Sequence, residues 1–334
     1  MKLRTVEYDK SINAINLIDQ RNLPFKLDYI NCHNSEECAT LIKDMATRGA
    51  GAIGAMAAYG MAQAIIMGEN IDIAHTTLLN ARPTAVDLKN GIDYVYAHPL
   101  DPYNAAQNFV EGIVKDCEEL KRHGQELIKP NMRVLTHCNA GWLAFVEEGT
   151  GSATAPIYGA HDEGKKPFVW VDETRPRLQG AQLTAWELER YGVEHKIITD
   201  NSAASLMAQG KVDLIVTGAD RVCAKSGHAF NKIGTYSLAV LAKYHGIPFY
   251  IAAPKSTLDK DNTFDKVVIE ERNENEVKQV TGETLFMEEV IEVAITNKNS
   301  KAYNQAFDCT PPELITGYIT PKGIVKADEL LGVH

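Results

Sequence analysis

The sequence lacks the features that mark disulfide-rich, metal-binding and membrane-spanning proteins. Its six cysteines form no CxxC pair and no zinc-ligand spacing, so we interpret them as reduced thiols. The longest apolar stretch, Ile53 to Met67, is interrupted by Gln63 and is shorter than the roughly 20 residues that span a bilayer. No apolar signal-peptide core follows Met1, and none of the familiar targeting tails ends the chain. We therefore expect a cytoplasmic protein that does not use a membrane and has a buried helix at Ile53 to Met67.

Positive charge is also scarce. The chain has 34 lysines and arginines against 44 aspartates and glutamates, a formal net charge of −10. Binding to nucleic acid requires clustered cations, so this balance argues against nucleic acid as the main partner. An anionic small molecule remains a possible substrate, because a few local arginines and lysines are enough to hold it. The 334 residues allow one or two domains.

The pattern of apolar residues divides the chain near Lys129. Residues 5–30 contain two short alternating segments, which predict a strand pair, and helical periods then follow. Ser35 is the expected N-cap of a helix towards Thr47, and further helices are expected over 55–67, 71–80, 85–97 and 103–127. We therefore predict a mainly helical N-terminal domain over residues 1–128.

From residue 129 to residue 334, short apolar runs alternate with helix-length amphipathic segments. Strands are expected at 133–138, 168–172, 196–200, 212–218 and 249–253, with helices between them, including 142–148, 182–192 and 233–244. This alternation is typical of βαβ units, in which helices cover both faces of a parallel sheet. The predicted fold class is α/β, with a doubly wound, mostly parallel C-terminal domain. The acidic stretch Glu270 to Glu276 is interpreted as a solvated loop.

A glycine-rich segment, Arg48-Gly49-Ala50-Gly51-Ala52-Ile53-Gly54, precedes the first apolar helix. Free amide groups at a helix start, together with the Arg48 charge, can hold a phosphate. The segment lacks the Lys-Ser/Thr of a P-loop and follows a helix, whereas a dinucleotide fingerprint follows a strand. The alternative is that its glycines only permit close helix packing.

Cys138 and Asp220 are the candidate catalytic residues, because each follows an apolar strand and should lie at the same edge of the sheet. A thiol ahead of a helix N-terminus has a lowered pKa, and a partly desolvated carboxyl has a raised pKa suited to a general acid. His137 precedes Cys138, but neighbours on a strand point to opposite faces and cannot form a local pair. The alternatives are a small buried apolar residue at Cys138 and a salt bridge at Asp220.

Further candidate anion-binding residues lie in three segments. The run from Glu173 to Gly180 offers two arginines and Gln179 before a helix, and Asn231-Lys232 precedes another predicted helix. Arg82 occupies a turn between helices. A solitary arginine is often only a surface charge.

Taken together, six motifs in order resemble the 5-methylthioribose-1-phosphate isomerase family, and the resemblance continues to Cys309-Thr-Pro-Pro-Glu. The motifs are Arg48-Gly-Ala-Gly-Ala-Ile-Gly, Ala81-Arg-Pro-Thr-Ala-Val, Thr136-His-Cys-Asn-Ala-Gly, Asp172-Glu-Thr-Arg-Pro-Arg-Leu-Gln-Gly, Gly218-Ala-Asp-Arg and Asn231-Lys-Ile-Gly-Thr-Tyr. That family shares its fold with the regulatory subunits of initiation factor 2B and with ribose-1,5-bisphosphate isomerases. The resemblance implies a Rossmann-like C-terminal domain and an aldose–ketose isomerase.

The resemblance also assigns residues and partners. It places the catalytic pair at Cys138 and Asp220, and it implies a homodimer that uses no metal and no cofactor. It implies that the sugar phosphate contacts Arg48, Gly49, Ala50, Arg82, Gln179, Asn231 and Lys232. Asp220 would help the ring oxygen leave. Cys138 would either remove the C2 proton as a thiolate or shape an apolar site for a hydride shift.

Three departures from the family pattern bear on the substrate: Gly51 and Gln305 each replace a usual proline, and Trp142 with Glu147-Glu148 changes the segment after Cys138. We expect that segment to border the site and to set the preference at C5. The substrate is expected to be 5-methylthioribose 1-phosphate or 5-deoxyribose 1-phosphate. The alternatives are a ribose-1,5-bisphosphate isomerase and a non-catalytic subunit like those of initiation factor 2B.

Overall fold

The chain begins with a three-stranded antiparallel sheet. The computed structural model describes residues 2–82, 85–287 and 289–333, so Pro83 and Thr84 of the Ala81–Val86 motif lie outside the described residues. The strands are β1 (Val6–Asp9), β2 (Ala14–Ile18) and β3 (Tyr29–Cys32). The predicted strand pair missed β3, because this edge strand is largely exposed and carries little apolar alternation.

Five helices follow, as the helical periods predict. They are α1 (Ser35–Lys43), α2 (Ala50–Met67), α3 (Ile71–Leu79), α4 (Val86–Tyr96) and α5 (Pro102–Gly124). The N-cap of α1 is Asn34, whose side chain accepts from the Glu37 amide, so the expectation of Ser35 was wrong by one residue. Helix α2 begins at Ala50, earlier than the predicted Ala55, because the small residues of the glycine-rich segment are already helical.

Helix α2 is apolar on nearly all sides. By length and composition it could cross a membrane, but 78% of it is buried inside the protein, as in the core helix of a globular fold. Its residues form a core with α1, α3, α4 and α5 that includes Ile53, Met56 and Tyr59. The expected buried helix is therefore present.

The second half of the chain forms a seven-stranded sheet in the order β16-β15-β10-β7-β4-β5-β6. All neighbours pair in parallel except β15 with β16. The strands are β4 (Arg133–Thr136), β5 (Phe168–Asp172), β6 (Glu194–Ile198), β7 (Leu214–Thr217), β10 (Phe249–Ala252), β15 (Gly317–Thr320) and β16 (Gly323–Val325). Strand β6 starts two residues before the predicted range.

Helices cover both faces of this sheet. Val134 of β4 and Val216 of β7 belong to one core, which includes residues of α6 (Ala155–Asp162) and α7 (Ala185–Tyr191). Leu135 and Ile215 belong to the other, with residues of α8 (Ala203–Ala208) and α9 (Thr235–His245). Adjacent strand residues therefore serve opposite cores, which is why the apolar runs are continuous.

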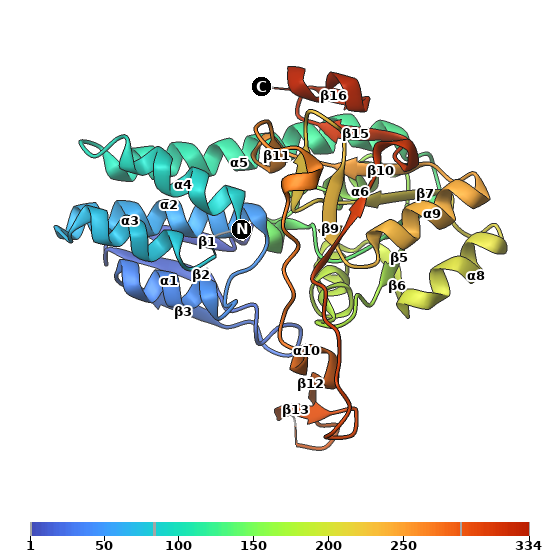
Figure 1. Ribbon diagram of the computed structural model, residues 1–334, viewed down its shortest axis with the longest axis horizontal. Helices are drawn as coiled ribbons and strands as arrows, with labels where there is room; N and C mark the ends of the chain where they lie inside the picture. Colours follow the sequence, from blue (N-terminus) through green and yellow to red (C-terminus); the bar gives the residue numbers. More distant parts are fainter. Residues whose placement is uncertain (1, 83–84, 288, 334) are drawn as a thin grey trace.

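Two smaller sheets complete the fold. A four-stranded sheet has the order β11-β8-β9-β14, and a hairpin joins β12 to β13. Their bounds are β8 (Arg221–Cys223), β9 (Ala229–Lys232), β11 (Leu258–Asp259), β12 (Gln279–Glu283), β13 (Val290–Ala294) and β14 (Phe307–Thr310), with α10 (Asn275–Lys278) before the hairpin. Figure 1 shows α1 to α4 at one end of the molecule, the large sheet at the other, and the hairpin projecting away from both.

The segment after Cys138 differs from the prediction. The expected helix over 142–148 is a single 3₁₀ turn, Trp142–Ala144, followed by two bends and by Glu147, which forms an isolated bridge with Arg4. Trp142 is fully buried in the core, and Glu147 pairs with Lys2 and Arg4. These long-range contacts, which a local pattern does not contain, hold the segment out of a helix.

Candidate active site

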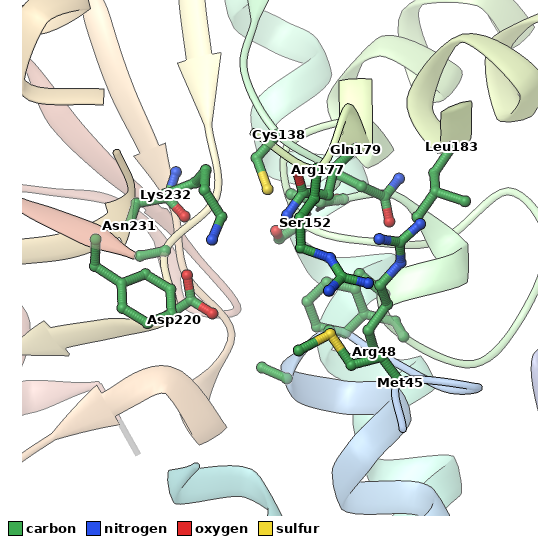
Figure 2. A pocket seen from close by; sticks show the side chains of 18 of the residues that line it. Met45, Arg48, Cys138, Ser152, Arg177, Gln179, Leu183, Asp220, Asn231 and Lys232 are labelled. Carbon is green, nitrogen blue, oxygen red and sulfur yellow. Dashed lines mark hydrogen bonds between the residues drawn. The ribbon is translucent and has the colours of Figure 1, made fainter. Parts of the chain in front are cut away.

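The nine residues expected to form the site all line one cavity of about 790 Å³, its open mouth included. They come from both halves of the chain. Figure 2 shows Asp220, Asn231 and Lys232 on one wall, facing Cys138, Gln179 and Arg48 on the other. The cavity lies at the carboxyl ends of β4 and β7, where parallel sheets bind ligands.

The backbone of Cys138 is held in a left-handed conformation with φ of 66°. Its amide donates to Thr174 Oγ1 at 2.9 Å, and its carbonyl accepts from Thr184 Oγ1 at 2.7 Å. These bonds fix the thiol at the strand end in a conformation that side chains rarely adopt, which is a frequent feature of functional positions. The two threonines belong to the segments that follow β5.

Burial raises the pKa of the Cys138 thiol to about 11, although Lys232 and Arg48 oppose the shift. The expectation of a lowered pKa was wrong for two reasons. The segment after Cys138 contains only a short 3₁₀ turn, so there is no helix dipole to favour the thiolate, and desolvation dominates. At neutral pH Cys138 is therefore a thiol.

Asp220 lies in the loop between β7 and β8, where its amide donates to the Phe230 carbonyl at 2.9 Å. Burial raises the pKa of its carboxyl, while Lys232 and Arg82 act in the opposite direction. A raised pKa is what a carboxyl needs to be a proton donor near neutral pH.

Two arginines on the wall opposite Asp220 have unused hydrogen-bonding capacity. Nε of Arg48 and Nε of Arg177 are buried and have no partner among the described residues. Burial, together with the charge of Arg177, lowers the pKa of Arg48 to about 10. A buried cation is costly without an anion, so this wall is built for a negatively charged ligand.

The N-terminus of α2 contributes a second cationic element beside Arg48. Its N-cap, Gly49, has φ of 95° and provides no side-chain cap, so the first amides of this 18-residue helix stay available. A Cβ at Gly49 would lie 2.3 Å from Cα of Ala144, which explains the glycine. The two hypotheses for the glycine-rich segment, phosphate binding and close packing, are therefore compatible, because the segment packs closely and also presents free amides.

The second helix start expected to bind an anion is already occupied. Asp308 of β14 accepts from the amides of Gly234 and Tyr236 at 2.7 and 3.1 Å, so its carboxylate caps α9. The helix begins at Thr235, and Asn231 and Lys232 belong to strand β9 instead of the turn before the helix. Asn231 and Lys232 nevertheless line the cavity. Asn231 pairs with Asp308 of the neighbouring strand β14.

Lys232 is 8% exposed and lies beside the catalytic candidates. Its Nζ donates to the Ala306 carbonyl at 3.2 Å and lies 4.7 Å from the centre of the Phe307 ring. Burial lowers the pKa of this amine, whereas Cys138 and Asp220 raise it. An ammonium with a single carbonyl partner retains donors for a substrate oxygen.

His137 points away from Cys138, as expected from the strand geometry. Its Nδ1 lies 2.8 Å from Asp172 and its Nε2 lies 2.9 Å from the Ile233 carbonyl. Burial opposes the charged form, but the Asp172 carboxylate raises the pKa of His137. The two contacts of the ring tie β4, β5 and the turn before α9 together.

The local pattern misled the prediction for the stretch Glu270 to Glu276. Arg272 lines the cavity and pairs with Glu270 and Glu276, and Glu276 also accepts from Arg177 at 2.9 Å. Despite burial, these arginines lower the pKa of Glu276 to about 2. The alternation of charges in this stretch is the signal that could have indicated an ordered ion-pair network.

Other lining residues carried no chemical signal in the sequence: Met45, Ala144, Phe145, Ser152 and Leu183. The segment after Cys138 borders the cavity as expected, through Ala144 and Phe145, whereas the departing residues Trp142, Glu147 and Glu148 are not among the lining residues. Gly51 explains one of the departures, because a Cβ there would lie 2.5 Å from the Phe145 ring. Gln305 donates to the Phe307 carbonyl at 2.7 Å, next to a lining residue.

Comparison with known proteins places the chain among relatives of similar length. The model of the initiation factor 2 subunit family matches residues 46–327. A putative methylthioribose-1-phosphate isomerase of Methanocaldococcus jannaschii is 48% identical, with 98% of each chain covered. A crystal structure of 5-methylthioribose 1-phosphate isomerase from Pyrococcus horikoshii superposes with a TM-score of 0.85 at 36% identity, covering 98% of this chain and 94% of that one.

A structure titled translation initiation factor eIF-2B, subunit delta, from A. fulgidus is nearly as similar, with a TM-score of 0.81 at 37% identity and coverage of 98% and 97%. The fold alone therefore does not separate enzymes from initiation-factor subunits. The chain belongs to the initiation factor 2 subunit family and, within it, groups with the methylthioribose-1-phosphate isomerases.

Proposed function

We propose that this protein is an aldose–ketose isomerase that converts a 5-modified ribose 1-phosphate to the corresponding ribulose 1-phosphate. The proposed substrates are 5-methylthioribose 1-phosphate and 5-deoxyribose 1-phosphate. The names of the relatives support the first of these two sugars. The observation that carries the proposal is that Asp220 faces Cys138 and the cations Arg48 and Arg177 across one cavity, and that Nε of each arginine has no partner among the described residues.

The phosphate binds at the cationic wall. Arg48, Arg177 and the free amides at the start of α2 surround one region of the cavity, and Gln179 adds a buried side chain whose Oε1 has no partner among the described residues. A phosphate dianion compensates the buried guanidinium charge of Arg48, adds a partner for Arg177 and accepts from the amides. Its binding energy fixes the sugar relative to the groups that react.

Asp220 supplies the proton that opens the ring. The protonated carboxyl donates its proton to the ring oxygen, the bond between this oxygen and C1 breaks, and the C4 hydroxyl forms. Positive charge then develops at C1, beside the negative carboxylate left on Asp220. Lys232 and Arg82 hold this carboxylate in place.

Hydrogen then moves from C2 to C1. Because Cys138 is a thiol at neutral pH, we favour a hydride shift over proton removal by a thiolate. The hydride carries its electron pair to C1, the C2 hydroxyl becomes the carbonyl, and the hydroxyl proton returns to Asp220. Cys138 excludes water and packs beside the migrating hydrogen.

The alternative functions meet specific obstacles in the site. A non-catalytic subunit has no need of a buried thiol facing a carboxyl with a raised pKa. A ribose-1,5-bisphosphate isomerase requires a second set of unpaired cations. Of the two further arginines of the cavity, Arg272 is already paired with Glu270 and Glu276, and Arg82 lies near the carboxyl of Asp220.

We further propose that the chain acts as a homodimer in the cytoplasm, and that it divides into a mainly helical domain over 1–128 and a Rossmann-like domain over 129–334. The sheet with helices on both faces supports the second assignment. Sedimentation of the purified protein tests the dimer.

The function is tested by a side-by-side assay of 5-methylthioribose 1-phosphate, 5-deoxyribose 1-phosphate and ribose 1,5-bisphosphate, with products followed by NMR. We expect ketose from the first two sugars at rates far above that from the bisphosphate. Binding of the sugars without turnover would support the regulatory alternative, and preference for the bisphosphate would support the other isomerase.

A further inference from the structure

A second cavity of about 710 Å³ opens beside Asp220 and shares five lining residues with the first. The shared residues are Gly49, Ala50, Arg82, Asp220 and Phe307. The second cavity extends towards an apolar surface that includes Ile53, Phe230 and Val267. Its other charged residues are Arg221, Asp87 and Glu270.

The proposed chemistry places the C5 substituent in this second cavity. Asp220 donates to the ring oxygen, which is bonded to C1 on one side and to C4 on the other, and C4 carries C5. With the C1 phosphate at Arg48 and Arg177, C5 must lie on the far side of the ring oxygen. The second cavity begins there, at Asp220.

Asp87 is the unusual group in the second cavity. It is 2% exposed, in the first turn of α4, and neither of its carboxyl oxygens has a hydrogen bond of normal geometry among the described residues. A buried carboxyl that has no well-formed hydrogen bond within the described part of the chain is costly to the fold, so its presence beside a ligand cavity calls for a role in binding.

The charged groups around Asp87 do not neutralise it. Asp220 lines the same cavity, and the charge of Asp116 of α5 also acts on Asp87, but Asp116 is itself paired with Lys255 at 3.2 Å. Arg82 and Arg221 of the cavity lie near Asp220 and Asp259 respectively. Burial raises the pKa of Asp87 to about 7, with the hydroxyl of Ser256 opposing the shift and Asp220 and Asp116 adding to it. Above neutral pH Asp87 is therefore mostly a carboxylate.

We propose that Asp87 is a specificity-determining residue, whose buried carboxylate rejects substrates with an anionic group on C5 and so confines the site to ribose 1-phosphates with an uncharged C5 substituent. The inference rests on the proposed isomerase function and assigns the selectivity of the same site. A like charge in a desolvated cavity discriminates strongly, whereas the apolar wall accepts a methyl or methylthio group.

The test compares kcat/KM for ribose 1,5-bisphosphate with kcat/KM for 5-methylthioribose 1-phosphate at about pH 8, where Asp87 is mostly charged. We expect Asp87→Asn to raise the ratio by roughly tenfold or more. The matched control is Asp116→Asn, which removes a nearby carboxylate that does not line the cavity and should leave the ratio unchanged. An unchanged ratio in Asp87→Asn, or an equal rise in Asp116→Asn, would overturn the inference.

Asp87→Ser is a second neutral variant should Asp87→Asn not fold, and the same rise is expected.

Ile53→Val tests the position of the C5 substituent without changing charge, since the removed methyl group should raise the ratio of 5-methylthio to 5-deoxy turnover several-fold. No change would place C5 elsewhere and overturn the argument for Asp87. If the wild-type protein converted none of the sugars, the proposed isomerase function itself would be wrong.

Discussion

At the scale of single residues, the protonation state of Cys138 decides between the two routes of hydrogen transfer. A thiol with a pKa raised to about 11 is a poor base at neutral pH. We therefore expect no solvent deuterium at C1 of the product when the reaction is run in D₂O and followed by NMR. Deuterium at C1 would show that a base removes the C2 proton, and the thiol would then have to ionise in the substrate complex.

Arg48 illustrates how a binding residue can weaken the free protein. Its buried guanidinium has an unpaired Nε and a pKa lowered to about 10, which corresponds to about 3 kcal/mol against the charged form. We expect Arg48→Gln to raise the free energy of unfolding by about 1–3 kcal/mol and to increase KM strongly. Denaturant unfolding and steady-state kinetics measure the two effects.

The same variant should lose stabilisation by ligand. Inorganic phosphate should raise the melting temperature of the wild-type protein more than that of Arg48→Gln, because only the wild-type cavity has its full set of cations. A matched control is Arg190→Gln, whose exposed guanidinium pairs with Glu148 outside the cavity. If phosphate raised the melting temperature of all three proteins equally, Arg48 would not belong to the phosphate site.

At the scale of elements, the start of α2 depends on Gly49. A side chain there would meet Ala144 at 2.3 Å in a backbone with φ of 95°. We expect Gly49→Ala to destabilise the protein clearly more than Gly68→Ala does. Gly68 ends the same helix with φ of 71° and has nothing within 4 Å of its Cβ, so it reports the backbone strain alone, roughly 1 kcal/mol. Similar losses in chemical denaturation would contradict the close packing at Gly49.

The elements also show what sequence can and cannot predict. The helices over 71–80 and 85–97 and the strand at 168–172 appear almost as predicted, because their periodicity is strong and local. The segment after Cys138 was predicted as a helix, but its conformation depends on contacts of Thr5 and Arg4 with Trp142 and Glu147. No periodicity encodes contacts between such distant segments.

The site follows the same rule. Cys138 and Asp220 could be placed together because parallel strands end at one edge of a sheet. Arg272 could not, since its place in the cavity depends on an ion pair with Glu276 and on the path of a segment without regular structure. Likewise, the capping of α9 by Asp308 required knowledge of the pairing between β14 and β9.

At the scale of the whole molecule, one hydrophobic core crosses the predicted boundary at residue 128. Ile18, Leu23 and Leu120 pack in the same core as Val134, Val169 and Val216 of the large sheet. We therefore expect a single unfolding transition in calorimetry, with equal calorimetric and van't Hoff enthalpies. Two separated transitions would show that the parts on either side of residue 128 unfold independently.

The central claim is that this cavity isomerises a ribose 1-phosphate with Asp220 as the acid. Its most direct test is the kcat of the wild-type protein and of Asp220→Asn on 5-methylthioribose 1-phosphate, with the ketose product followed by NMR. The account predicts that the wild-type protein forms the ribulose 1-phosphate and that Asp220→Asn is slower by roughly 10²–10⁴-fold, the loss expected for a general acid. A kcat for Asp220→Asn close to that of the wild-type protein would contradict it.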